Sequence, residues 1–225
     1  MNPSTLTIIT TEDGSPSFLN TALGETYHSR HGAVQESTHV FIQAGLMHRR
    51  HAGAHALQVF EIGFGTGLNA ALAVAHAQSL NYPLTYHTIE KYPLLPLQHA
   101  EYIASAPIEL QAILHTVSAA PWDITSSIGD GIQLTKMKGD ALEAPFADCD
   151  VLFLDAFAPA VSPELWAPEM MQKYFACLKP GGIMVTYCAK GAVRRAMQSA
   201  GFEVERIPGP PGKREMLRAT KTITR

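Results

Sequence analysis

The chain has 225 residues, of which 46% are hydrophobic, enough for one domain with a sizeable core. Its formal net charge of −3 argues mildly against a nucleic-acid-binding protein, because phosphate contacts require lysine and arginine. The sequence shows neither a run long enough for a transmembrane helix nor a secretory signal, so we expect a cytoplasmic protein without membrane contact.

Short strands bounded by turns are expected near the N-terminus, at residues 6–11 and 17–20, followed by a helix over residues 33–45. Further along the chain, strands and helices alternate. The expected strands are 56–61, 84–90, 151–155, 183–188, 202–207 and 215–220. The expected helices are 70–79, 94–105, 109–114, 168–177 and 192–200, and residues 123–138 are expected to form a hairpin-like excursion.

This alternation indicates an α/β fold with a doubly wound sheet. We expect residues 1–55 to form an N-terminal extension packed on a catalytic domain of residues 56–225. The last two expected strands, 202–207 and 215–220, are separated by a Pro- and Gly-rich turn, which suits an antiparallel pair at one edge of the sheet. Doubly wound sheets bind ligands at the carboxyl ends of their strands, so residues that follow strands are the candidates for a site.

The most informative segment is residues 59–69, Val-Phe-Glu-Ile-Gly-Phe-Gly-Thr-Gly-Leu-Asn. A short buried strand ends on an acid and runs into three alternating glycines, which allow a sharp turn and a close approach to a ligand. These residues are Glu61, Gly63, Gly65 and Gly67. A dinucleotide-binding fingerprint would place its third glycine at Leu68, whereas E-x-G-x-G-x-G is the form found in S-adenosyl-L-methionine (SAM) methyltransferases. A plain tight turn is the alternative.

Three more acids follow expected strands. Glu90 lies 23 residues after Gly67, where an acid commonly accepts hydrogen bonds from a ribose diol. Asp140 is placed to bind an adenine amino group, and a simple turn is the alternative. Asp155 ends an apolar strand and precedes Phe157, an arrangement common in amine methyltransferases. The carboxylate can accept the proton of an amine, and the aromatic ring can stack on a flat base. A helix N-cap is the alternative for Asp155.

Basic residues gather in places that could form a local patch for a polyanion, despite the net negative charge. They are Arg49, Arg50, Arg194, Arg195, Lys213, Arg214, Arg218, Lys221 and Arg225. Solvated surface charge is the alternative for any single pair. We expect no metal site, because Gly53 separates His51 from His55 and the three cysteines lack metal-binding spacing.

Seven segments resemble the methyltransferase module of the MnmC family, whose stand-alone members are called MnmD. They are residues 24–29, 35–41, 61–69, 90–94, 155–163, 191–195 and 212–217. The segments Asp-Ala-Phe-Ala-Pro and Gly-Lys-Arg-Glu-Met-Leu are more specific than the glycine loop. The resemblance covers nearly the whole chain and implies a class I, Rossmann-like SAM-dependent methyltransferase with a mostly parallel seven-stranded sheet.

The resemblance also implies a tRNA-modifying enzyme. It would methylate the 5-aminomethyl group of the wobble uridine, or of its 2-thio form, to 5-methylaminomethyl. SAM is the implied cofactor and tRNA the implied partner, on which upstream wobble-uridine modification enzymes also act. Bifunctional members carry a C-terminal FAD-dependent oxidase. Since this sequence ends at Arg225, we expect neither that activity nor FAD, and no stable protein partner.

The motifs assign expected roles to individual residues. Cofactor binding falls to Glu61, Gly63, Gly65, Gly67 and Glu90, with Asp140 as a weaker candidate. Asp155 would face the amine and Phe157 the uracil ring. Tyr27 and Glu36 would close the pocket. The residues that would bind phosphates are Arg194, Arg195, Lys213 and Arg214. Two alternatives stay open, namely a methyltransferase for a small-molecule or protein amine and a non-catalytic SAM-binding module.

Overall fold

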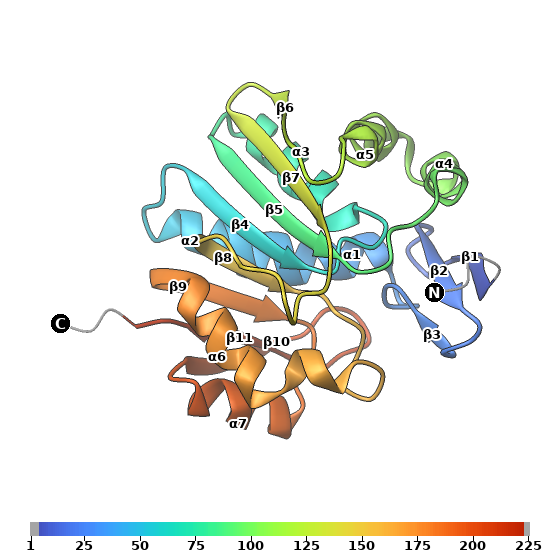
Figure 1. The fold of residues 1–225 in the computed structure, drawn as a ribbon. Helices are drawn as coiled ribbons and strands as arrows, with labels where there is room; N and C mark the ends of the chain where they lie inside the picture. The colour runs from blue at the N-terminus through green and yellow to red at the C-terminus, as the bar shows by residue number, and fades with distance from the viewer. Residues whose placement is uncertain (1–4, 223–225) are drawn as a thin grey trace.

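A sheet of eight strands runs through the computed structural model, which describes residues 5–222 (Figure 1). Its strand order is β10-β11-β9-β8-β4-β5-β7-β6. The strands are β4 (Leu57–Ile62), β5 (Leu84–Glu90), β6 (Thr125–Gly129), β7 (Ile132–Lys138), β8 (Cys149–Leu154), β9 (Leu178–Thr186), β10 (Glu203–Pro208) and β11 (Glu215–Thr220). Residues 1–4 and 223–225, at the outer ends of the two expected domains, lie outside the described residues. The basic candidate Arg225 is one of them.

The central strands β7, β5, β4, β8 and β9 pair in parallel, whereas β11 is antiparallel to both β9 and β10. The doubly wound sheet and its antiparallel closing pair are thus confirmed. The expected count of seven strands is one too low. The Asp130-Gly131 turn, with Gly131 at a φ of 68°, folds β6 back onto β7 as an extra edge strand, because a left-handed turn residue suits a tight hairpin.

Helices cover both faces of the sheet (Figure 1). They are α1 (Ala33–Ser37), η2 (Thr38–Met47), α2 (His48–His51), α3 (Leu68–Ser79), α4 (Pro96–Ser105), α5 (Ile108–Ala119), η3 (Pro163–Trp166), α6 (Pro168–Cys177) and α7 (Gly191–Ser199). The first three form one continuous helical segment, π-helical in its middle, which is longer than the helix expected from the sequence. This segment, α3 and α5 share one apolar core with the sheet, and α6 and α7 share the other.

A second, antiparallel sheet of three strands, β1 (Leu6–Thr10), β2 (Pro16–Asn20) and β3 (Glu25–Thr26), precedes the helices. Figure 1 shows it beyond the carboxyl ends of the central strands, next to α4. Buried Phe18 of β2 anchors it by stacking on Tyr102 of α4, with ring centroids 6.0 Å apart. Phe18 also meets the edge of Tyr27, just after β3, at 5.8 Å. The small sheet is thereby fixed above the end of the central sheet.

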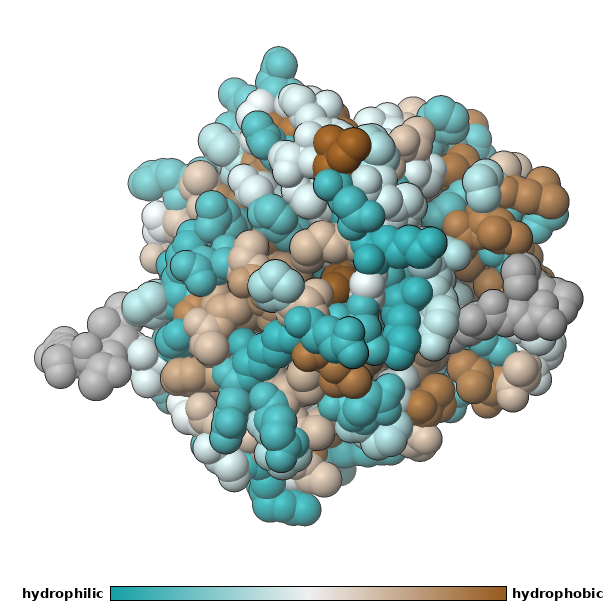
Figure 2. Space-filling view, viewed as in Figure 1, coloured by the Kyte–Doolittle hydropathy of each residue, from teal (hydrophilic) through white to brown (hydrophobic). Residues whose placement is uncertain are grey.

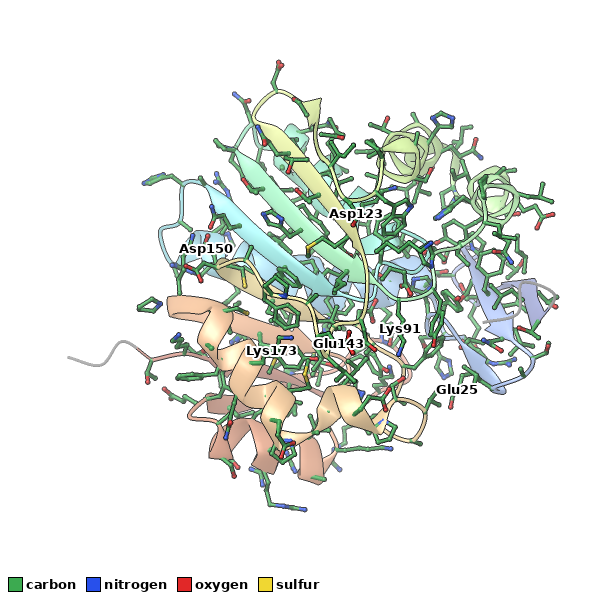
Figure 3. The ribbon with its side chains drawn as sticks, viewed as in Figure 1. Glu25, Lys91, Asp123, Glu143, Asp150 and Lys173 are labelled. Carbon is green, nitrogen blue, oxygen red and sulfur yellow. The ribbon has the colours of Figure 1, made fainter. Side chains whose placement is uncertain are left out.

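The two ends of the central sheet differ in character. At the amino end, Asp150 accepts hydrogen bonds from the Gln58 backbone N–H (2.9 Å) and from Lys179 Nζ (3.1 Å), which ties three neighbouring strands together. Figure 3 shows Asp150 there, away from Lys91 and Glu25, which line the cavity at the other end. Figure 2 shows a mixed polar surface with exposed apolar side chains near α4. No helix within residues 5–222 is long and apolar enough to cross a membrane.

Candidate active site

A cavity of about 780 Å³ lies at the carboxyl ends of β4, β5, β7 and β8, under the small N-terminal sheet. Its volume falls in the usual range for sites that bind small molecules or cofactors. The walls come from the glycine loop, from the segments that follow each of the four strands, and from residues 20–29 of the small sheet. The position agrees with the expectation that doubly wound sheets bind ligands at this edge.

The glycine loop forms the floor of this cavity. Gly63 has a φ of 94°, and a Cβ at this position would lie 2.9 Å from the carbonyl oxygen of Asp155, so only glycine lets the two backbones approach this closely. Gly63 and Gly65 line the cavity. Gly67 instead adopts a left-handed conformation at the N-terminus of α3, outside the cavity lining. Its role is therefore conformational and not one of direct contact.

Glu90 lines the cavity at the end of β5. Its Oε2 accepts a hydrogen bond from the Gly65 backbone N–H (3.1 Å), and its Oε1 accepts one from the Tyr92 N–H (2.8 Å). Burial raises the pKa of the Glu90 carboxyl, while these backbone donors act in the opposite direction by favouring the carboxylate. The carboxylate is thus held in a fixed orientation, and its remaining lone pairs can accept hydrogen bonds from vicinal hydroxyls.

Asp140 also lines the cavity, after β7. It forms an ion pair with Lys91 (2.7 Å) and accepts a hydrogen bond from the Leu142 N–H (3.0 Å). The hydrogen bond from Lys91 holds the pKa of Asp140 below its ordinary value, so the group is an anionic acceptor. An amino group entering from the cavity would find a hydrogen-bond acceptor here.

Asn69, in the first turn of α3, lies between Asp155 and Glu61. Asn69 Nδ2 lies 2.7 Å from Asp155 Oδ2 and 3.0 Å from Glu61 Oε1, so one amide donates to both carboxyl groups. Asp155 lines the cavity, whereas Glu61 is fully buried behind Asn69 and does not. Burial raises the pKa of Asp155 well above its ordinary value and that of Glu61 to about 8. Glu61, which the sequence assigned to cofactor binding, thus contacts Asn69 and stands behind the cavity wall in this structure.

Aromatic side chains fix the loop that follows Asp155. Trp166 Nε1 donates to the carbonyl oxygen of Phe157 (2.8 Å), and Tyr187 Oη donates to that of Ala156 (2.8 Å). Tyr27 meets the Phe157 ring edge-on, with centroids 5.4 Å apart and planes at 90°. Tyr27, Phe157 and Tyr187 all line the cavity, which gives a flat ring several surfaces to pack against.

An ion pair joins the two terminal regions of the chain at the cavity wall. Glu36 of α1 is bonded to Lys213, before β11, and also accepts a hydrogen bond from the Ser29 N–H (2.7 Å). Lys213 Nζ lies 4.0 Å from the centre of the Tyr187 ring. Both members of the pair line the cavity. Lys213 thus points into the pocket, and not outward as a phosphate ligand would.

The other basic candidates lie outside the cavity lining. The side chain of Arg214 is 91% exposed. Arg195 is exposed on α7, where Arg194 is half-buried. The structure therefore separates Lys213 from the three arginines with which the sequence grouped it. Sequence reasoning missed Asn69 and Tyr187, and the signal for Asn69 was a single polar residue within the apolar first two turns of α3.

Known proteins are similar to this chain in sequence and in fold. Residues 111–222 match a family model described as S-adenosyl-L-methionine-dependent methyltransferase. A protein from Aromatoleum aromaticum, named tRNA 5-methylaminomethyl-2-thiouridine biosynthesis bifunctional protein MnmC, is 33% identical over 220 residues. The match covers 92% of this chain and 34% of the relative, so the chain spans about a third of that protein's length.

Two solved structures are similar in fold. The crystal structure of MNMC2 from Aquifex aeolicus aligns with a TM-score of 0.81 at 25% identity, covering 97% of this chain and 71% of that one. SAM-bound CalS10, an amino pentose methyltransferase from Micromonospora echinaspora, aligns with a TM-score of 0.51 at 12% identity. That match covers 86% of this chain and 93% of CalS10, and it shows a shared fold alone.

The close approach of Gly63 to Asp155 can be tested with a matched pair of glycines. Gly14 has a similar φ of 83° but open space where a Cβ would lie. Gly14→Ala should lower the free energy of unfolding by about 1 kcal/mol, from backbone strain alone. Gly63→Ala should cost at least about 2 kcal/mol and also weaken SAM binding, as measured by urea unfolding and calorimetry. Equal effects of the two changes would contradict the proposed close approach.

The raised pKa of Glu61 predicts a pH dependence of stability. An unfolded glutamate ionises near its ordinary pKa of 4.5, whereas the folded one ionises near pH 8. Between these values the unfolded state binds fewer protons, so the stability contributed by Glu61 is lost as the pH rises. The Glu61→Gln variant should become more stable relative to wild type as the pH rises from 4 to about 8. Urea unfolding between pH 4 and 9 measures this difference. Glu109→Gln, which removes an exposed carboxyl group, is the matched control. A pH-independent difference would contradict the burial of a neutral Glu61.

Proposed function

We infer that this chain belongs to the SAM-dependent methyltransferases. On that premise, we propose that it methylates the 5-aminomethyl group of the wobble uridine or 2-thiouridine of tRNA. The observation that carries the proposal is the position of Asp155, a carboxyl group in the cavity wall directly beside the glycine loop. A methyl donor in that loop and an amine at Asp155 would be neighbours. The MnmC relative, whose name includes 5-methylaminomethyl-2-thiouridine, supports an amine on this nucleoside as the acceptor.

The residues at the cavity floor fit SAM. The backbone of Gly63 and Gly65 is open to the methionine part, Glu90 can accept hydrogen bonds from the ribose hydroxyls, and Asp140 can accept one from the adenine amino group. When bound, SAM supplies a methyl group that is already activated by the positive sulfonium. We therefore propose that the reaction uses neither FAD nor a metal ion, since it involves no redox step and needs no Lewis acid.

The chain's own residues have two tasks, to orient the substrate and to remove a proton. An alkylamine is largely protonated at neutral pH and becomes a nucleophile only after it loses that proton. Asp155 is the group we assign as acceptor. We assign Phe157, with Tyr27 at its edge, to contact the uracil ring, and Tyr27 and Glu36 to close the cavity over it. Such positioning can supply several kcal/mol of the barrier.

A tRNA substrate requires that the wobble base leave its stack and enter the cavity. Arg195 and Arg214 are exposed and free of the cavity wall, so we propose that they contact phosphates, with Arg194 in support. Lys213 is assigned instead to the base-binding pocket, because it is paired with Glu36 and lies against Tyr187.

The decisive experiment is the transfer of labelled methyl from SAM to tRNA taken from cells that lack this modification, followed by nuclease digestion and mass analysis of the nucleosides. We expect 5-methylaminomethyl-uridine or its 2-thio form, made only when the 5-aminomethyl precursor is present. The control is tRNA without that precursor. Binding of SAM without methylation of tRNA would overturn the proposal in favour of a small-molecule or protein amine.

The phosphate contacts predict a specific salt dependence. Arg195→Ala combined with Arg214→Ala should weaken tRNA binding and lower the slope of log affinity against log salt by about 1.5, since two phosphate contacts are lost. SAM affinity should not change. The control is Lys179→Ala, at the opposite end of the sheet, and thermal unfolding first verifies that it is folded, because Lys179 is paired with Asp150. An unchanged salt slope, measured by titration from low to high salt, would show that these arginines are ordinary surface charges.

A further inference from the structure

One amide group connects two carboxyl groups beneath the cavity. Glu61 is the second-last residue of β4, and Asp155 follows β8, the parallel neighbour of β4. The glycine loop then returns the chain so that Asn69, at the start of α3, lies between them. Its Nδ2 is 2.7 Å from Asp155 Oδ2 and 3.0 Å from Glu61 Oε1. Because an amide nitrogen carries two hydrogens, both contacts can be made at once, and the Asp155 carboxyl is fixed in orientation.

The charges around this trio leave the two carboxyls without a cation. The titratable groups that face them are Tyr86, Glu90, Glu36, Lys213 and Tyr187. The single cation among them, Lys213, is paired with Glu36, and the oxygens of Glu90 accept backbone hydrogen bonds. Within residues 5–222, neither Asp155 nor Glu61 forms an ion pair. Two neighbouring carboxylates without a cation are costly when one of them is fully buried and the other half-buried, so the pair favours holding one proton.

The position of that proton follows from the hydrogen bonds. Glu61 is 0% exposed, and the hydroxyl groups of Tyr86 and Thr88, which have no other partner among the described residues, face its carboxyl group. Asp155, by contrast, lines the cavity, where a cationic amine can stabilise its charge. Oε2 of Glu61 can carry the proton and donate it in a hydrogen bond to one of the two hydroxyl oxygens, without disturbing the contact of Oε1 with Asn69. Asp155 then keeps the negative charge at the surface where the substrate arrives.

We propose that Asn69 is a positioning residue for methyl transfer, which holds Asp155 toward the substrate amine and couples it to Glu61, so that the two carboxyls keep one proton between them. The inference rests on the proposed function, in which Asp155 receives a proton from the aminomethyl group. In that step an N–H bond of the ammonium breaks, its electron pair stays on nitrogen, and an O–H bond forms on Asp155. The proton on Glu61 prevents a second negative charge from building up behind Asp155.

A double-mutant cycle tests whether Asn69 acts through Asp155. Single-turnover methylation of tRNA is measured for wild type, Asn69→Ala, Asp155→Asn and the double variant. Asn69→Ala should slow methyl transfer about tenfold or more in the wild-type background but less than about twofold when Asp155 is already asparagine. Equal slowing in both backgrounds would overturn the proposal, because Asn69 would then act on its own, for example by contacting the cofactor.

A second variant and two controls keep the cycle interpretable. Asn69→Asp preserves the shape of the side chain but removes its donors, and it should slow transfer at least as much as Asn69→Ala. Thermal unfolding and SAM binding verify that each variant is folded and loads the cofactor. If Asn69→Asp, folded and SAM-bound, retains wild-type turnover, the proposed donor role is wrong. If wild type itself fails to methylate tRNA, or Asp155→Asn is fully active, the failure lies with the proposed function.

The shared proton has its own readout in the pH profile. Glu61→Gln replaces a titrating group by one that cannot ionise, so the ratio of wild-type to variant turnover should be constant near pH 6 to 7 and change as Glu61 ionises at higher pH. The same ratio for Glu109→Gln should not change with pH. A wild-type to Glu61→Gln ratio that is constant from pH 6 to 9 would overturn the coupling between the two carboxyls.

Discussion

The parallel pairing of β4 with β8 is the constraint on which the rest of the site depends. It aligns the ends of two strands, so that the glycine loop after β4 and the segment after β8 leave the sheet side by side. Gly63 then lies against the backbone of Asp155 at a distance that no side chain would permit. In the proposed function, this contact would bring the methyl donor and the amine acceptor together before any side-chain chemistry is considered.

The site is completed by parts of the chain that are far apart in sequence. The small N-terminal sheet, anchored through Phe18 and Tyr102, places Tyr27 over the glycine loop and against Phe157. Near the other end of the chain, Lys213 closes the wall through its ion pair with Glu36. The small sheet is separate from the central sheet, and Lys213 lies in the turn between β10 and β11, at one edge of the central sheet. Both closing elements can therefore shape the cavity without altering β4, β5, β7 and β8, the strands that form its floor.

Charge is distributed unevenly between the cavity and the surface. The cavity is lined by several carboxylates and by two cations, Lys91 and Lys213, each of which is paired with an acid. Such a pocket suits a cationic amine and a sulfonium. The exposed arginines stand outside it, where a polyanion can reach them. In the proposed function, a protein with a net negative charge would in this way bind a polyanion at its surface and a cation in the cavity.

The sequence by itself determined the α/β alternation, the glycine loop, and the acids at the ends of successive strands, because these follow from local periodicity and from residue types with restricted backbone preferences. It also indicated Asp155 and Glu90 as cavity residues. Only the tertiary structure decided that Glu61 lies behind Asn69, that Gly67 shapes a helix start, and that Lys213 turns inward to Glu36. Those outcomes depend on contacts between distant segments, which set burial and pairing and leave no local pattern in the sequence.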